Sequence, residues 1–324
     1  MPSSNRAATV MTLTLVSVLG VSTAHGQELT VYSSGPGELA NNLVSGFEEE
    51  TGVDVNLFQS TTGDVMSRLE AERVNPQADV IISASWDSAA DLEAEGRLLD
   101  YTSSNAESVP DFLVNDTYTA QGVAALSLAY NTQSDVPRPS EWEDLRDPVY
   151  TDQVSMPDPA QSGSAYDFVA GLVSDRGEDA WALLDVLADQ GLIVPGANRA
   201  ALNPVLQGGR SVVFGAVDYI ALGQAARGES VEVIHPDSGT VIAPRPIMIQ
   251  ADTDQPDQAK SFVDFVLSET GQRMVADVFL MPARADIPAD RATIDELTVI
   301  ETKDDVAADR EALLGRFKEV TEGR

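Results

Sequence analysis

Three short loops in the sequence combine hydroxyl side chains with glycine, a composition that suits anion binding. They are Ser33-Ser34-Gly35, Thr61-Thr62-Gly63 and Ser162-Gly163-Ser164. Each precedes a predicted helix, where free backbone N–H groups and the positive end of the helix dipole attract negative charge. A serine or threonine is also the usual N-cap of a helix, so capping alone explains any single loop. A binding site is indicated only if the three loops meet.

The order of strands and helices favours such a meeting. Strand-like segments at 28–33, 53–57 and 78–82 alternate with amphipathic helical segments at 38–50 and 60–72. This alternation is typical of a parallel sheet with helices packed on it. Because the carboxyl ends of neighbouring parallel strands share one edge of a sheet, the first two loops are expected at one crevice.

A second block repeats this pattern and contains the third loop. Its predicted elements are a strand at 154–156, helices at 164–173 and 178–189, and a strand at 211–215. The chain crosses between the blocks near 120–135 and again near 235–250, so we predict two lobes joined by a hinge. Helices at 258–268, 271–278 and 305–321 are expected to complete the first lobe.

The predicted fold class is therefore α/β with two lobes, each a mixed and mostly parallel sheet flanked by helices, and a ligand cleft between them. Two domains also suit the length, because single cores seldom grow past about 250–300 residues. The predicted boundaries are 1–26 for a signal peptide, 27–125 and 239–324 for lobe 1, and 126–238 for lobe 2.

The N-terminus has the layout of a secretory signal peptide. One basic residue, Arg6, precedes an uncharged apolar stretch from Ala7 to Val21, and Ala24-His25-Gly26 provides small residues before a cleavage point near Gly26/Gln27. The apolar stretch is too short for a membrane span. The chain has no cysteine, so no lipid-acceptor residue is present. We predict a periplasmic protein that is not a lipoprotein.

The charge of the chain restricts its partners. Asp and Glu number 52 against 20 Lys and Arg, which gives a formal net charge of −32. Such a chain repels nucleic acid and anionic lipid, so neither is an expected partner. The acidic residues are spread along the chain, which indicates a solvated surface of the halophilic type, suited to a salty exterior where charge repulsion is screened.

The residue inventory argues against an enzyme. Without cysteine there is no thiol nucleophile, and no G-x-S-x-G or H-E-x-x-H motif occurs. A Ser-His-Asp arrangement in the mature chain would depend on His235, which is followed by a proline in a turn-like segment. A secreted hydrolase is the alternative from a different class, and neither a cofactor nor a resident metal is expected.

Several motifs resemble those of the bacterial substrate-binding proteins of ABC importers, in the branch that takes ferric iron, 2-aminoethylphosphonate, hexose phosphates and polyamines. The matching segments are Val31-Tyr32-Ser33-Ser34, Phe47 to Val53, Thr62-Gly63, Asn75 to Val80, Met156 to Ser164, Ala216-Val217-Asp218-Tyr219 and His235 to Thr240. The resemblance implies the type II two-lobed fold, closure by a hinge, and delivery of a small-molecule ligand to the transmembrane subunits of a permease. We expect a monomer.

The resemblance also implies which residues contact the ligand. From lobe 1 these are Ser33, Ser34, Thr61, Thr62 and Ser85, and from lobe 2 they are Ser162, Gly163, Ser164, Asn198, Asp218 and Tyr219. Trp86 follows Ser85 and is expected to serve packing more than ligand stacking. Arg199 would clamp a phosphate if it pointed inward, but an exposed position on this acidic surface is favoured.

Two ligand classes stay open. Ferric binders of this branch use adjacent tyrosines, whereas this chain has Asp218-Tyr219, so iron would depend on one carboxylate and one phenolate. An organic phosphate or phosphonate such as 2-aminoethylphosphonate fits better, because hydroxyls and helix N-termini hold its anionic end. In that hypothesis Asp218 holds an amine or sugar hydroxyls and Tyr219 donates a hydrogen bond.

Overall fold

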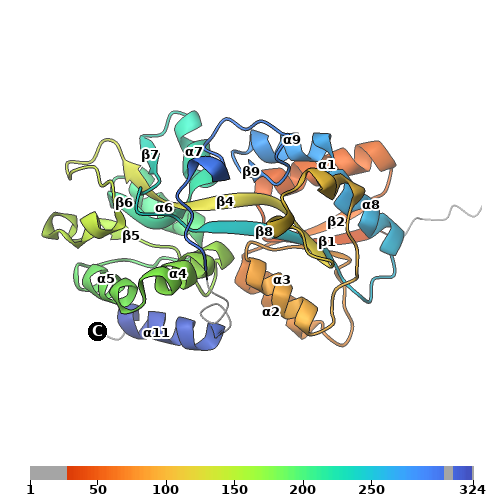
Figure 1. Ribbon diagram of the computed structural model, residues 1–324, viewed down its shortest axis with the longest axis horizontal. Helices are drawn as coiled ribbons and strands as arrows, with labels where there is room; N and C mark the ends of the chain where they lie inside the picture. Colours follow the sequence, from red (N-terminus) through yellow and green to blue (C-terminus); the bar gives the residue numbers. More distant parts are fainter. Residues whose placement is uncertain (1–27, 303–308, 323–324) are drawn as a thin grey trace, which may run out of the picture.

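The computed structural model describes residues 28–302 and 309–322, which form two α/β lobes lying side by side (Figure 1). The predicted signal peptide and its cleavage point lie outside the described residues. Within the described ranges, every helix is too short or too polar to span a bilayer.

Lobe 1 is built around β1 and its parallel neighbours β2 and β3, with β8 antiparallel to β3. Its elements are β1 (Leu29–Ser33), α1 (Gly37–Thr51), β2 (Val55–Gln59), α2 (Thr62–Ala71), β3 (Val80–Ile82), α3 (Trp86–Ala94), β8 (Ile242–Ile249), α8 (Pro256–Val266), α9 (Glu269–Asp277) and β9 (Met281–Pro282).

Alternate residues of the lobe 1 strands bury two separate apolar faces. Val31 and Val80 contribute to the core that contains α1, α8 and α9, while Tyr32 and Ile81 contribute to the core that contains α2 and α3. The period of two in a strand explains this division. Helices therefore cover both faces of the sheet (Figure 1), which leaves the carboxyl ends of the strands as the edge from which loops can reach a ligand.

Lobe 2 has β6 between its parallel neighbour β5 and the antiparallel β4, which also pairs with β7. Its elements are β5 (Val154–Ser155), α4 (Gly163–Arg176), α5 (Glu178–Asp189), α6 (Asn198–Leu206), β6 (Val212–Val217), α7 (Asp218–Ala226) and β7 (Val231–Ile234). Short 3-10 turns occur at Ser104–Ser108, Asp111–Leu113, Trp142–Arg146, Pro148–Tyr150 and Ile294–Glu296. Trp142, Phe168 and Phe214 form an aromatic cluster in the core, with ring centroids 5.0–5.3 Å apart.

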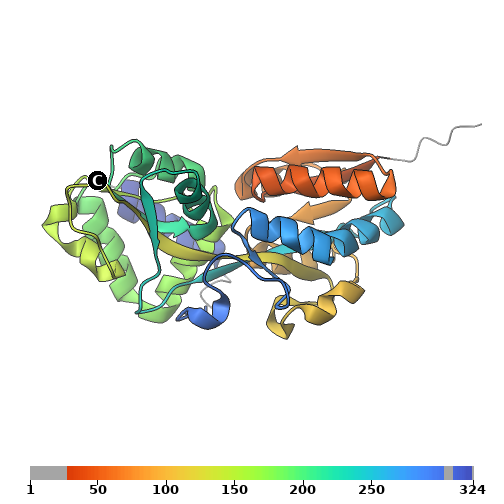
Figure 2. The ribbon, with the colours of Figure 1, turned by 90° about the horizontal axis from the view of Figure 1, so that it is seen from above.

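Two long strands connect the lobes. β4 (Tyr118–Asn131) is buried along its whole length; residues 118–125 pair with β8, and residues 126–131 pair with β6 and β7. Figure 2 shows β4 and β8 crossing the narrow region between the two lobes. A joint made of two paired strands allows one lobe to rotate against the other while each core stays intact.

The C-terminal helix corrects one expectation. The helix predicted at 305–321 was assigned to lobe 1, but α11 (Arg310–Glu322) packs against α5 of lobe 2. Arg316 pairs with Glu178, with Nη1 and Oε1 2.8 Å apart, and its guanidinium lies 4.5 Å from the centroid of the Trp181 ring. Lobe 2 therefore offers this helix both a carboxylate and an aromatic face, which hold its cationic side chains.

Candidate functional site

A cavity of about 580 Å³ lies between the two lobes. Its described lining from lobe 1 and the crossing strand consists of Ser34, Gly35, Pro36, Gly37, Glu38, Gln59, Ser60, Thr61, Thr62, Ala84, Arg245, Asp277, Val278 and Phe279. From lobe 2 it consists of Gln161, Ser162, Ala197, Asn198, Arg199, Tyr219, Ile220, Gly223, Gln224, Ala226 and Arg227. The volume falls in the usual range of roughly 300–1,000 Å³ for small-molecule sites.

On lobe 1 the cavity wall is formed where β1 and β2 end and α1 and α2 begin. Ser34 follows β1, and its backbone N–H donates to the carbonyl of Ile82 at 2.9 Å, which fixes the loop against β3. Thr61 is the N-cap of α2, since its hydroxyl accepts a hydrogen bond from the N–H of Asp64 at 3.2 Å. The hydroxyl of Thr62 donates to that of Ser34 at 3.3 Å, which joins the two loops.

On lobe 2 the wall is formed by the starts of α4 and α6. Ser162 caps α4 by accepting from the N–H of Ala165 at 3.2 Å, and its hydroxyl donates to Oδ1 of Asn198 at 3.0 Å. The amide nitrogen of Asn198 donates to the hydroxyl of Ser164 at 3.2 Å. Asn198 therefore links the two helix starts, and both Ser162 and Asn198 line the cavity while Gly163 and Ser164 lie behind them.

Four helix N-termini, two from each lobe, thus begin at the cavity: those of α1, α2, α4 and α6. The first-turn N–H groups of a helix have no partner within the helix, and the helix dipole adds roughly half a positive charge at the same end. Their convergence places partial positive charge on the cavity walls, so the arrangement suits an anionic group.

Arg245 is a residue of the cavity that the sequence reasoning missed. It lies in β8, is only 1% exposed, and donates through Nη2 to the carbonyl of Ser34 at 2.9 Å. Its Nε and Nη1 atoms are buried without a hydrogen-bond partner. A signal was present, since Pro244-Arg245-Pro246 places a charged residue between prolines in an apolar crossing strand. A buried guanidinium with free donors needs an acceptor to offset its desolvation.

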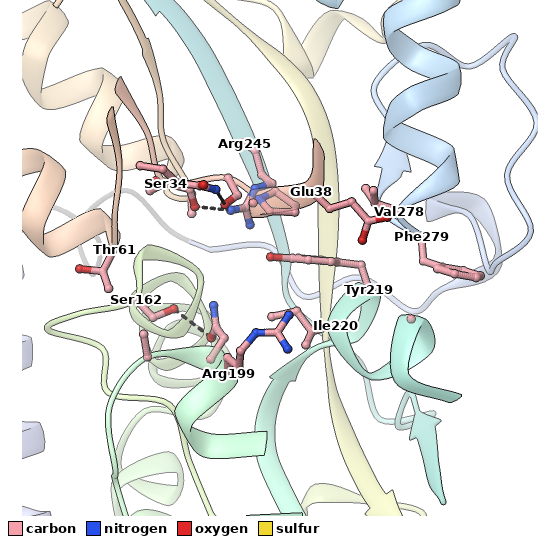
Figure 3. A pocket seen from close by; sticks show the side chains of 18 of the residues that line it. Ser34, Glu38, Thr61, Ser162, Arg199, Tyr219, Ile220, Arg245, Val278 and Phe279 are labelled. Atoms are coloured by element: carbon pink, nitrogen blue, oxygen red, sulfur yellow. Dashed lines mark hydrogen bonds between the residues drawn. The ribbon is translucent and has the colours of Figure 1, made fainter. Parts of the chain in front are cut away.

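Tyr219 and Arg245 form one side of the cavity. The Arg245 guanidinium lies 5.5 Å from the centroid of the Tyr219 ring. Figure 3 shows the Tyr219 hydroxyl pointing into the cavity, between the side chains of Arg245 and Arg199 in this view. Tyr219 is 7% exposed, so its ring is largely fixed by packing and its hydroxyl is available as a hydrogen-bond donor.

Asp218 does not face the cavity, contrary to the prediction. Its carboxylate is completely buried and receives hydrogen bonds from the Arg291 guanidinium and from the backbone N–H groups of Ala125 and Tyr219, at 3.1, 3.2 and 2.8 Å respectively. Nε2 of His235 lies 3.2 Å away. Because these groups occupy both oxygens, Asp218 supports the hinge region and is unavailable to hold an amine, a sugar hydroxyl or a ferric ion.

Ser33 and Ser85 also lie outside the cavity lining. Ser33 is 1% exposed and its hydroxyl accepts from the N–H of Gly35 at 3.0 Å. Ser85 is fully buried, and its hydroxyl donates across the lobes to Oδ1 of Asp167 in α4 at 2.8 Å. Burial raises the pKa of Asp167 well above its ordinary value, and the negative charge of Asp87 adds to this rise.

Direct contacts between the lobes surround the cavity. The N–H of Gly63 donates to the carbonyl of Gln161 at 3.3 Å. An added Cβ at Gly63 would lie 2.8 Å from the Ala160 carbonyl oxygen, and one at Gly163 would lie 2.8 Å from the Cβ of Ser85. Such approaches are possible only without a side chain, so the glycines of the second and third loops allow the lobes to touch.

The positions of Arg199 and Trp86 were open from the sequence. Arg199 is exposed, as the sequence analysis favoured, and it also lines the cavity at the start of α6. Trp86 is absent from the lining and packs edge-on against Tyr118, with ring centroids 4.7 Å apart, in keeping with the expected packing role. The described residues contain no group of three or more His, Cys, Asp or Glu side chains that could hold a metal ion.

Comparison with known proteins gives the context of this site. Residues 75–302 match the family model described as bacterial extracellular solute-binding protein. The chain is 28% identical over 292 residues to a putative 2-aminoethylphosphonate-binding periplasmic protein of Salmonella typhimurium, and the match covers 85% of this chain and 86% of that protein.

Solved structures share the two-lobed architecture. The periplasmic binding protein AfuA of Actinobacillus pleuropneumoniae, with fructose-6-phosphate bound, has a TM-score of 0.83 at 22% identity and covers 91% of this chain and 98% of its own. A ferric binding protein from Campylobacter jejuni has a TM-score of 0.78 at 22% identity and covers 90% and 99%. These likenesses confirm the α/β periplasmic-binding-protein fold expected from the sequence.

Proposed function

The chain belongs to the family of bacterial extracellular solute-binding proteins, its relatives indicate a periplasmic solute-binding component of an ABC transporter, and we propose that its cargo is an organic phosphate or phosphonate. The two lobes close on the solute by rotation about β4 and β8, and the loaded protein delivers it to the permease. The protein acts as a carrier and performs no chemistry on its cargo.

One observation carries the choice of ligand: Arg245 is buried at the cavity with two free donor atoms. Transferring an ionised group from water is expensive unless it gains a counter-charge and hydrogen bonds. A phosphate or phosphonate oxygen supplies both, and a planar guanidinium can hold two such oxygens at once. The four helix N-termini at the same cavity add donors that favour the same charge.

A hydrolase is not supported by the surroundings of His235. Its imidazole contacts the buried carboxylate of Asp218, which is also bound by Arg291. In the described part of the chain no serine hydroxyl is found among the hydrogen-bond partners of His235, so the arrangement lacks the nucleophile of a catalytic triad.

The proposal is tested by calorimetric titration and thermal shift in phosphate-free buffer. The probes are 2-aminoethylphosphonate, fructose-6-phosphate, spermidine and ferric citrate. At a hundredfold excess over Kd a true ligand adds about 2.7 kcal/mol to the free energy of unfolding, which gives a clear rise in Tm. A shift with at least one phosphorus-containing probe is expected, and a shift with spermidine or ferric citrate alone would contradict the proposal.

Variants then locate the site. Arg245→Gln should weaken the phosphorus-containing ligand by at least tenfold, because one charge-assisted contact contributes roughly 1.5–3 kcal/mol. Arg273→Gln is the matched control, since Arg273 is an exposed arginine of lobe 1 that pairs with neighbouring Glu269. Equal affinity in the two variants would place the ligand elsewhere.

A further inference from the structure

The cavity presents two arginines whose charge is not neutralised by an ion pair. Arg245 projects from the crossing strand β8, and Arg199 projects from the start of α6 on lobe 2 (Figure 3). No ion pair or hydrogen bond joins the Arg199 side chain to another residue in the described ranges. Arg245 donates only to a backbone carbonyl, that of Ser34. The two guanidinium groups therefore belong to different lobes and are both available to a bound solute.

The remaining charges at the cavity do not cancel these two. Arg227, the residue after α7, and Glu38 of α1 form an ion pair of 2.9 Å with more than half of each side chain exposed. Asp277 is an exposed residue at the end of α9. The lining thus contains three arginines and two carboxylates, one of which is already paired. A cationic excess at this point contrasts with a net charge of −32 for the whole chain.

Buried carboxylates near the cavity also leave Arg245 unbalanced. Asp167 is close enough for Arg245 to lower its pKa, but burial and Asp87 dominate and raise that pKa well above its ordinary value. The direction of this shift favours the uncharged acid over a counter-charge for the guanidinium. Asp218 is committed to Arg291. Neither Asp167 nor Asp218 is among the residues that line the cavity, so neither is placed to receive an ammonium group from a ligand there.

The size of the cavity allows a solute with two separated charged groups. A water molecule takes up about 30 Å³ in the liquid. A cavity of about 580 Å³ has many times that volume, so it has room for a solute larger than a single phosphate group. In the view of Figure 3 the Tyr219 hydroxyl lies between the side chains of Arg245 and Arg199, so a solute held by Arg245 at one end would reach Arg199 of the opposite lobe past that hydroxyl. Contact with both lobes is also what closure of the cleft requires.

We propose that the solute carries two anionic groups, a phosphate or phosphonate bound by Arg245 and a second acidic group, carboxylate or phosphate, bound by Arg199. This inference rests on the proposed function and narrows it to doubly acidic solutes, with aminophosphonates disfavoured. Arg199 is then the residue that sets specificity, because an amine in place of the second acid would face a like charge.

Three synthetic probes that share a phosphonate and differ only at the other end test the inference. They are 3-phosphonopropionate, 2-aminoethylphosphonate and propylphosphonate, titrated into the protein in phosphate-free buffer. We expect 3-phosphonopropionate to bind at least tenfold more tightly than the other two. In Arg199→Gln this advantage should disappear while the affinity for propylphosphonate stays within a factor of two, and Arg245→Gln should weaken all three.

The outcomes separate this inference from the proposed function. Tightest binding of 2-aminoethylphosphonate, or an advantage of 3-phosphonopropionate that survives in Arg199→Gln, overturns the inference and leaves the phosphonate site intact. Absence of binding by all three probes, with a thermal shift on spermidine or ferric citrate, overturns both. Arg138→Gln is the control for loss of a surface cation on lobe 2, because Arg138 pairs with Glu232 away from the cavity lining, and it should bind like the unaltered protein.

Discussion

Asp218 and Arg291 form an ion pair in which the two side chains are 0% and 1% exposed. The Arg291 guanidinium also donates to the carbonyl of Phe279 at 2.8 Å, so the pair ties the segment after β9 to the start of α7. Removing one member of such a pair leaves an uncompensated buried charge. Asp218 thus holds the neighbouring Tyr219 in the cavity wall through an ion pair with Arg291 that is buried behind this wall.

Substitution of Asp218 should therefore reduce stability. Asp218→Asn is expected to lower the free energy of unfolding by about 3–5 kcal/mol, because Arg291 then stays buried without its counter-charge. Urea unfolding followed by tryptophan fluorescence measures the change. The double variant Asp218→Leu/Arg291→Met should recover much of the loss. Unaltered stability with a selective loss of amine-bearing ligands would restore Asp218 as a ligand residue.

The hydroxyl of Tyr219 gives a second prediction. Tyr219→Phe keeps the ring against Arg245 and removes only the donor that points into the cavity. We expect the Kd of the cognate anion to rise by roughly tenfold, since a hydrogen bond to a charged acceptor contributes about 1.5–3 kcal/mol. The Tm without ligand should stay nearly constant. A fall of that Tm together with unchanged affinity would assign the hydroxyl a structural role.

Local sequence patterns predicted the loops at helix starts that form part of the cavity wall. Ser34, Thr61 and Ser162 line the cavity because hydroxyl residues at strand ends start helices, and parallel strands bring those starts to one edge. The same pattern also selected Ser33 and Ser85, which lie one layer deeper. A residue type at a helix start does not say which member of a pair of serines points outward.

Long-range partners could not be predicted from the sequence. The family resemblance implies that Asp218 contacts the ligand, and nothing near it in the sequence indicates Arg291, which lies 73 positions away. The helix at the C-terminus was assigned to the wrong lobe for the same reason, since its own pattern says only that one face is apolar. Arg245 is recognised as a ligand candidate once its free Nε and Nη1 atoms are found to be buried.

Close approach of the lobes at two glycines gives a third prediction. Gly63→Ala and Gly163→Ala each place a methyl group 2.8 Å from atoms of the other lobe in the closed arrangement. Overpacking of this kind costs about 1–3 kcal/mol, so ligand affinity should fall roughly ten- to hundredfold. Small-angle scattering should show that the ligand compacts the unaltered protein and compacts the variants less.

The control for the glycine variants is Gly315→Ala. Gly315 lies on α11, and an added Cβ there meets no atom within 4 Å. This variant should bind and compact like the unaltered protein. Full compaction of Gly63→Ala at saturating ligand, with unchanged Kd, would mean that the lobes close by a different approach.

A hydrogen bond from Ser85 to Asp167 joins the two lobes. Because the accepting carboxyl group can ionise, the stability of the folded protein depends on pH. Burial raises the pKa of Asp167, so the folded protein with its lobes in contact keeps a proton that the unfolded chain has released. Below the unfolded value of about 3.8 both states are protonated and the group has no effect on stability. As pH rises above that value the unfolded chain ionises first, which lowers stability until the folded group ionises as well.

Asp167→Asn should remove this effect, because the amide oxygen can still accept from Ser85 and the group no longer ionises. We expect the variant to have a higher Tm than the unaltered protein at pH 7, and the difference should vanish near pH 4. Thermal unfolding followed across this range by circular dichroism measures both. Ser85→Ala gives the complementary result, since it removes the hydrogen bond and leaves the carboxyl able to ionise, so its Tm should be lower while its dependence on pH persists. A Tm difference between the Asp167→Asn variant and the unaltered protein that is the same at both pH values would mean that Asp167 does not titrate between them.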